Sequence, residues 1–137
     1  MTKVQSTLAA SVAIAALAAA LSVASAQAQQ APSVKRTVLQ KHELRAQGQE
    51  GVMAYVEIPP GGREGRHTHP AEAFVYVLDG TLTFDVEGKP EATYKAGDSF
   101  FIEPGKIHEG MNKGKTAAKL VAVFVTDKGA PLTTQAQ

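Results

Sequence analysis

The segment GGREGRHTHPAEAFVYVLDG, from Gly61 to Gly80, contains two histidines one residue apart, His67 and His69. They lie between a glycine-rich turn and a run of strand-forming residues. Alternate side chains of a β-strand point to the same face, so both imidazoles are expected on one face of a sheet. Two imidazoles this close together form a chelating pair for a divalent metal ion. Glu72 follows three residues after His69 as a candidate carboxylate ligand.

A third histidine, His108, follows the turn-forming segment EPGKI at the point where a strand is expected to begin. A ligand from a distant strand would complete a three-residue metal site. The spacing alone leaves a second interpretation open, because His-x-His is a short pattern and single histidines near turns are often solvated. His42 has no partner pattern, and we interpret it as solvent-exposed.

Glycine and proline interrupt the chain at short intervals, and the segments between them are rich in Val, Ile, Phe, Tyr and Thr. In GTLTFDV, Leu82, Phe84 and Val86 alternate with polar residues, which is the period of a half-buried strand. Four other segments are more uniformly apolar and favour strands buried on both faces: 52–58, 73–78, 99–102 and 118–126.

Asp79 and Gly80 stand between two strand segments, and this dipeptide predicts a β-hairpin. No convincing amphipathic helix follows residue 30. Many short strands separated by turns favour an all-β sandwich or barrel.

Residues 1–28 have the features of a secretory signal peptide. Lys3 precedes an alanine-rich apolar segment, Leu8 to Val23, and small-residue patterns suited to cleavage end at Ala26 and Ala28. Cleavage near 26 or 28 predicts a periplasmic or secreted protein. An uncleaved membrane anchor is the alternative, but the polar QAQQAPS segment favours a cut N-terminus. The chain has no cysteine and therefore no disulfide.

Cleavage leaves 111 or 109 residues, enough for one domain with a core of its own. We expect the barrel over residues 34–130, with an extra strand at 34–39 and a frayed TTQAQ end. An edge strand must be paired or covered, which favours a homodimer. Because Lys3 is the only charge removed, 13 basic and 13 acidic residues remain. This balance indicates neither nucleic acid nor, after cleavage, a membrane as partner.

Two motifs resemble those of the small single-domain cupins, over about residues 50–127. Gly61, His67, His69 and Gly80 keep the register of the first cupin motif. The second motif is matched by four further residues: Gly97, Gly105, His108 and Asn112. The resemblance implies a cupin-type double-stranded β-helix, a jelly-roll barrel of two antiparallel sheets. It also implies that His67, His69 and His108 point inwards as metal ligands.

The sequence departs from the cupin pattern at two places. Ala73 stands where the glutamate ligand is expected, and Glu72 is one residue early, so strand alternation points its side chain to the opposite face. Glu103 likewise occupies the position of the usual proline, with Pro104 following. Three arrangements remain open: a three-histidine site, a four-ligand site completed by Glu72 or another carboxylate, or a pocket with weak or no metal.

The resemblance implies a metal-binding cupin of the periplasm, with a three-histidine non-heme iron dioxygenase as the activity to test on a small organic substrate. Fe(II) is the leading metal, and Mn, Ni, Zn and Cu suit imidazole ligands as well. Losing an anionic ligand makes the site more positive, which favours an anionic ligand or substrate. The alternatives are a non-catalytic small-molecule-binding or sensor protein, and a metal-dependent isomerase or decarboxylase.

Overall fold

The computed structural model describes residues 32–137, which form ten β-strands and no helix. The predicted signal peptide, residues 1–28, lies outside the described residues. Within residues 32–137 there is accordingly no helix of the length and hydrophobicity that a membrane span requires. The strands are β1 (Lys35–Glu43), β2 (Gln49–Ile58), β3 (His67–Thr68), β4 (Glu72–Asp79), β5 (Thr81–Val86), β6 (Ala92–Lys95), β7 (Ser99–Ile102), β8 (His108–Met111), β9 (Ala118–Asp127) and β10 (Thr134–Gln135).

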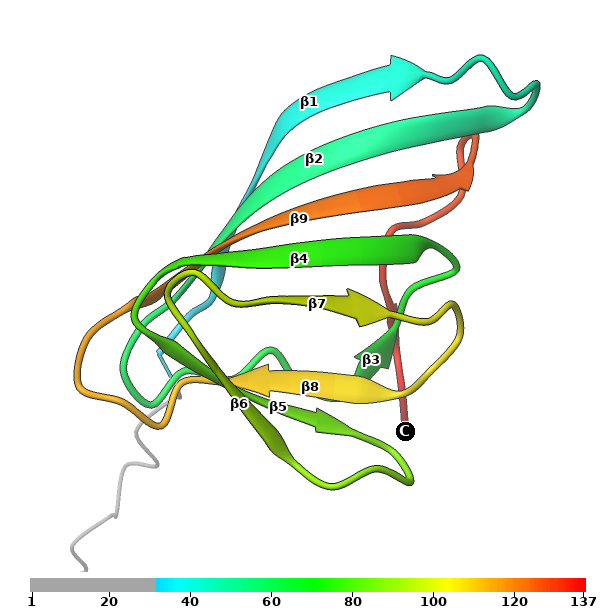
Figure 1. Ribbon diagram of the computed structural model, residues 1–137. Helices are drawn as coiled ribbons and strands as arrows, with labels where there is room; N and C mark the ends of the chain where they lie inside the picture. The colour runs from blue at the N-terminus through cyan, green and yellow to red at the C-terminus, as the bar shows by residue number, and fades with distance from the viewer. Residues whose placement is uncertain (1–31) are drawn as a thin grey trace, which may run out of the picture.

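Two antiparallel five-stranded sheets face each other, in the orders β1-β2-β9-β4-β7 and β10-β3-β8-β5-β6. Figure 1 shows these layers, with β2, β9 and β4 side by side in one and β3, β8 and β5 in the other. The chain passes repeatedly from one sheet to the other, because most neighbours within a sheet are not consecutive in sequence. The predicted all-β jelly roll of two antiparallel sheets is confirmed.

The core lies between the sheets and is built from alternate residues of each long strand. In β2 the inward residues Val52, Ala54, Val56 and Ile58 are buried, and the residues between them are half-buried. Strands β4 and β9 alternate in the same way. The prediction that these apolar strands are buried on both faces is therefore wrong: within residues 32–137, no layer covers the outer face of the first sheet.

The Asp79–Gly80 pair does turn the chain, but it does not form the predicted hairpin. Strand β4 pairs with β7 and β9 in the first sheet, whereas β5 pairs with β6 and β8 in the second. Gly80, with φ of 74°, therefore forms a corner between sheets. The dipeptide identifies a residue that adopts positive φ, but it does not determine which strands pair.

Both ends of the described chain join the sheets. Strand β1 extends beyond the predicted 34–39 and lies at the edge of the first sheet beside β2, with all its residues exposed. The TTQAQ tail, expected to fray, instead forms β10, which pairs with β3. The C-terminus consequently lies beside β3 (Figure 1).

Candidate metal centre

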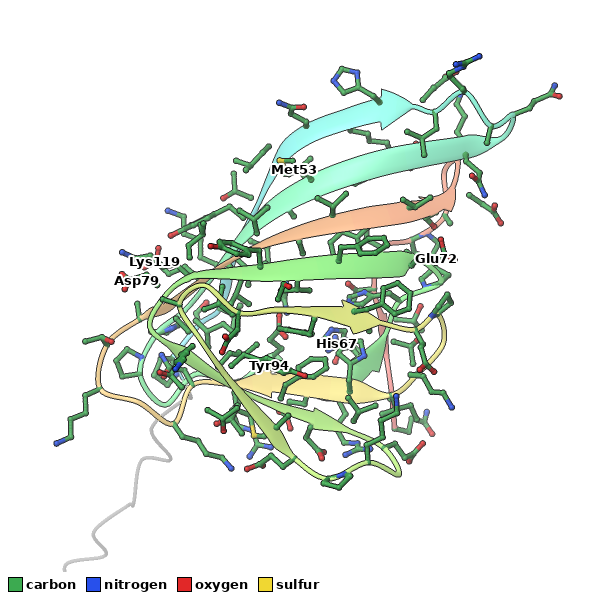
Figure 2. The ribbon with its side chains drawn as sticks, viewed as in Figure 1. Met53, His67, Glu72, Asp79, Tyr94 and Lys119 are labelled. Atoms are coloured by element: carbon green, nitrogen blue, oxygen red, sulfur yellow. The ribbon has the colours of Figure 1, made fainter. Side chains whose placement is uncertain are left out.

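The three predicted ligands, His67, His69 and His108, lie together inside the barrel. His67 on β3 and His108 on β8 are direct partners across the antiparallel ladder. Their ring centroids are 4.3 Å apart, and the His69 ring is 4.8 Å from each. All three side chains are buried, and one ring nitrogen from each lies within 4.8 Å of the others. Figure 2 shows His67 between the two layers.

The Nδ1 atom of each imidazole contacts a backbone carbonyl. His67 lies 2.7 Å from Gly65 O, His69 lies 2.6 Å from Leu132 O, and His108 lies 2.8 Å from Lys106 O. A carbonyl only accepts hydrogen bonds, so each Nδ1 carries the proton and donates it. Each Nε2 is then left with a free lone pair, which is the tautomer that binds a metal.

The His108 Nε2 atom is buried without a hydrogen-bond partner among the described residues. A buried polar atom of this kind costs free energy unless something satisfies it. Three imidazole lone pairs that converge without a proton between them fit a divalent transition-metal ion. The residues present therefore suit the metal that the sequence motifs imply.

Burial also favours the neutral form of two of the three imidazoles, which is the form that binds a metal. Burial lowers the pKa of His69 and of His108 to about 4, although the Leu132 and Lys106 carbonyls act in the opposite direction. Neighbouring imidazoles lower both values further. Since metal binding needs neutral imidazole, these two ligands are ready to bind at neutral pH without losing a proton.

The candidate carboxylate does not reach this cluster. Glu72 is exposed at the start of β4, away from His67 (Figure 2), and it is not one of the clustered residues. Ala73, in the position expected for glutamate, is fully buried on the inner face of β4. Its ladder partners are Phe124 and Ile102. The clustered donor set is therefore three imidazoles, and the Glu72 position agrees with strand alternation.

A cavity of about 260 Å³ adjoins His69 and His108. Its wall is largely apolar and includes Val56, Leu82, Phe84, Phe100, Leu120 and Phe124. The polar exceptions beyond the histidines include Arg36 and Glu64, which pair with each other at 2.9 Å.

Sequence reasoning missed Arg36, Glu64 and the Leu132 carbonyl. Arg36 reaches the cavity from β1, 28 residues before Glu64, and Leu132 lies between the expected end of the barrel at 130 and the TTQAQ end. Glu64 lies in the spacer between Gly61 and His67, where no pattern distinguishes it. These contacts depend on tertiary pairing, so the local sequence carries no signal for them.

The two arginines beside the first motif point elsewhere. Arg63 donates two hydrogen bonds to Glu109, of 2.9 and 2.6 Å, and this pairing lowers the pKa of the Glu109 carboxyl. Arg66 pairs with Asp85 and Glu87. Both arginines are partly exposed and lie outside the cavity lining.

Asn112, the last residue of the second motif, has a structural role. Its buried side chain donates to Ile58 O and Thr116 O and accepts from Gly114 N. Its backbone bonds both glycines that open the first motif, through Gly61 N and Gly62 O. These bonds tie the two motifs together and thereby support the loops that carry the histidines.

Comparisons with known proteins agree with this architecture. A cupin-like protein of Thermotoga maritima has a similar structure, with a TM-score of 0.64, 21% identity and 75% of each chain covered. An oxalate-binding protein of the same organism is 35% identical over 75 residues, 54% of this chain and 61% of that protein. Wheat (Triticum aestivum) oxalate oxidase GF-3.8 is 34% identical over 80 residues, 53% of this chain and 36% of that one.

The chain thus spans less than two thirds of the length of each of these two curated relatives, and the matched part is the barrel that holds the histidines. The model of the Cupin_2 family, the cupin domain, matches residues 54–124. That segment includes both histidine motifs and the strands that carry them. The chain belongs to the cupin family.

Proposed function

We propose that the protein is a metal-binding cupin in which His67, His69 and His108 hold one divalent ion, with Fe(II) as the leading metal. The observation that carries the proposal is the set of three buried imidazoles, each fixed by an Nδ1 contact to a carbonyl. Imidazole ligands alone do not select one metal, and Mn, Ni, Zn and Cu remain candidates beside Fe(II). The ion is therefore identified by measurement.

The cavity beside this centre takes a small organic anion. Three neutral imidazoles leave the full charge of the ion in place, because Ala73 supplies no carboxylate. The relatives named for oxalate support an anionic ligand. The activity we propose is a dioxygenase-like oxidation, in which bound Fe(II) supplies open positions for substrate and oxygen. The chain's residues orient the imidazoles and provide a dry, apolar wall.

A second candidate is non-catalytic binding of the same ligand. The Thermotoga maritima relative is named for binding oxalate, not for turning it over, and this favours a binding or sensor role. The isomerase and decarboxylase alternatives share the cavity but have no specific observation in their favour.

Two further properties belong to the proposal. The predicted signal peptide supports export to the periplasm or beyond. The exposed edge strand β1 and the uncovered apolar face of the first sheet support a homodimer.

The metal content of the mature protein, purified without chelator or histidine tag, tests the proposed centre. We expect about one ion per chain, after reconstitution with Fe(II) or Mn(II) if needed, because three converging imidazoles form one site. His108→Ala should lose the ion, and His42→Ala should retain it because His42 is exposed on β1. Metal that persists in His108→Ala would contradict the site.

Oxygen consumption by the Fe(II)-loaded protein separates the two candidate functions. The panel contains oxalate, diketones, thiols, flavonols and phenolic acids. Oxygen consumption that disappears in His108→Ala supports the dioxygenase-like activity. Binding without consumption across the panel favours the ligand-binding role.

A further inference from the structure

Arg36 and Glu64 form an ion pair that lines the same cavity as His69 and His108. Arg36 Nη2 lies 2.9 Å from Glu64 Oε1. The Arg36 side chain is 44% exposed and that of Glu64 only 12%. The guanidinium therefore lies at the solvent side of the cavity, and the carboxylate lies further in.

The fold leaves room for the Glu64 carboxylate. Glu64 N donates to Gly110 O at 3.0 Å, and a Cβ atom on Gly110 would lie 2.4 Å from Glu64 Oε2. Gly110 has no positive φ, so space, not backbone conformation, is what requires glycine there. Because Gly110 is two residues after His108 on β8, both face the barrel interior.

The remaining cavity wall sets the character of the ligand. It is formed mainly by Val, Leu, Ile and Phe side chains, and the volume is about 260 Å³. A ligand gains by burying apolar surface against such a wall, at roughly 25 cal/mol per Å². A two-carbon dicarboxylate has no apolar surface to bury and would have to desolvate charges instead.

We propose that the cavity selects a small monocarboxylate with an apolar body, and that Arg36 binds its carboxylate. The pair with Glu64 uses Nη2, and a guanidinium has five N–H donors, so Arg36 retains donors for a second carboxylate. Glu64 holds the guanidinium at the cavity and partly neutralises it. This ligand class narrows the proposed function. It rests on the proposed function only for the metal ion at the histidines.

Calorimetric titration of the Zn(II)-loaded and the metal-free mature protein tests this inference. The probes are benzoate, its uncharged analogue benzyl alcohol, and oxalate. We expect benzoate to bind the loaded protein more tightly than either of the others. Arg36→Gln should weaken benzoate binding by at least about tenfold, the value of a charge-assisted hydrogen bond, and leave benzyl alcohol unchanged.

Two further variants separate charge from shape. Glu64→Gln keeps the side-chain size and removes the competing charge, so benzoate should bind severalfold more tightly and benzyl alcohol as before. Arg66→Gln is the matched control, because Arg66 pairs with Asp85 outside the cavity, and it should match the parent.

The inference is overturned if benzoate does not bind the parent, if oxalate binds more tightly than benzoate, or if Arg36→Gln leaves benzoate affinity unchanged. Zinc content is measured in every sample. A parent that binds no zinc but still binds benzoate through Arg36 would contradict the proposed metal centre and leave this inference intact.

Discussion

At the scale of the residue, Ala73 determines the charge of the candidate metal centre. It is completely buried on the inner face of β4, where the cupin pattern has a glutamate. A carboxylate there would neutralise one charge of a bound divalent ion. With alanine, the ion keeps its charge, and an external anion has more to gain by binding beside it.

Ala73→Glu should make stability depend on the metal. Without metal, a buried unpaired carboxylate costs about 3 kcal/mol or more, which lowers the Tm by roughly 12 °C or more. With Mn(II), the carboxylate gains a ligand position, so the rise in Tm on adding metal should exceed that of the parent. Thermal unfolding with and without Mn(II) measures both effects.

Glu72→Gln is the control for this prediction. Glu72 is exposed on β4 and outside the histidine cluster, so both its Tm and its metal-dependent rise should match the parent. An Ala73→Glu variant with the parent's metal response would mean that residue 73 does not reach the site.

The clustered histidines follow from local rules, and the other cavity residues do not. Alternation places His67 and His69 on one face and turns Glu72 away from it, and the motif register brings His108 opposite His67. Arg36 and Glu64 meet through the packing of a distant strand on the barrel mouth. No periodicity within either segment contains that information.

At the scale of the element, the corner at Gly80 directs the chain from one sheet to the other. Its φ is 74°, and a Cβ atom there would lie 2.4 Å from the Ala117 carbonyl oxygen. Glycine is therefore required at position 80 for two reasons, the backbone conformation and the lack of space for a side chain. Asp79 supports the corner by accepting a hydrogen bond from Gly80 N at 2.9 Å.

Gly80→Ala should destabilise the fold more than Gly88→Ala. Both glycines have positive φ, of 74° and 78°, which costs alanine about 1–2 kcal/mol. Only at Gly80 does a backbone atom lie within reach of the new methyl group. Moving that backbone should cost a further 1–3 kcal/mol or so. Urea unfolding measures the difference, and equal costs would contradict the steric argument.

The Asp79–Gly80 turn and the C-terminal strand β10 both depend on pairing that their local sequence does not determine. Asp79–Gly80 predicts a turn, and the chain does turn there, but the turn joins the two sheets instead of two paired strands. The partners of β4 and β5 are chosen by burial of their inner faces, which is a property of the whole barrel. The TTQAQ end is similar: its polar sequence suggests fraying, yet it contributes β10, which pairs with β3, and the carbonyl of Leu132 just before it orients His69.

At the scale of the whole molecule, the first sheet has an uncovered apolar outer face. The ladder register aligns Phe101, Phe74, Val123 and Met53 in one row across β7, β4, β9 and β2. The next row contains Tyr76, Val121 and Tyr55. Phe74 and Tyr76 are 55% and 48% exposed. We call these seven residues the outer apolar face.

The proposed homodimer would place a second copy of the chain against this face. The outer apolar face carries no charge, so two copies related by a two-fold axis would meet without like-charge opposition. A sheet packs on another sheet at about 10 Å, with side chains of the two faces interdigitating. Burial in the proposed dimer would account for the apolar sequence of β4 and β9, which suggested burial on both faces.

Phe74→Lys should therefore convert a dimer into a monomer, because it buries an unpaired charge within the outer apolar face, between Phe101 and Val123. Light scattering coupled to size-exclusion chromatography measures the mass, expected to fall from two chains to one. Thr93→Lys is the matched control, since Thr93 is exposed on β6 in the other sheet. A monomeric parent would contradict the dimer, and a dimer that survives Phe74→Lys would place the interface elsewhere. Because the metal cluster lies on the opposite, inner side of the barrel, metal content should be the same in all three proteins.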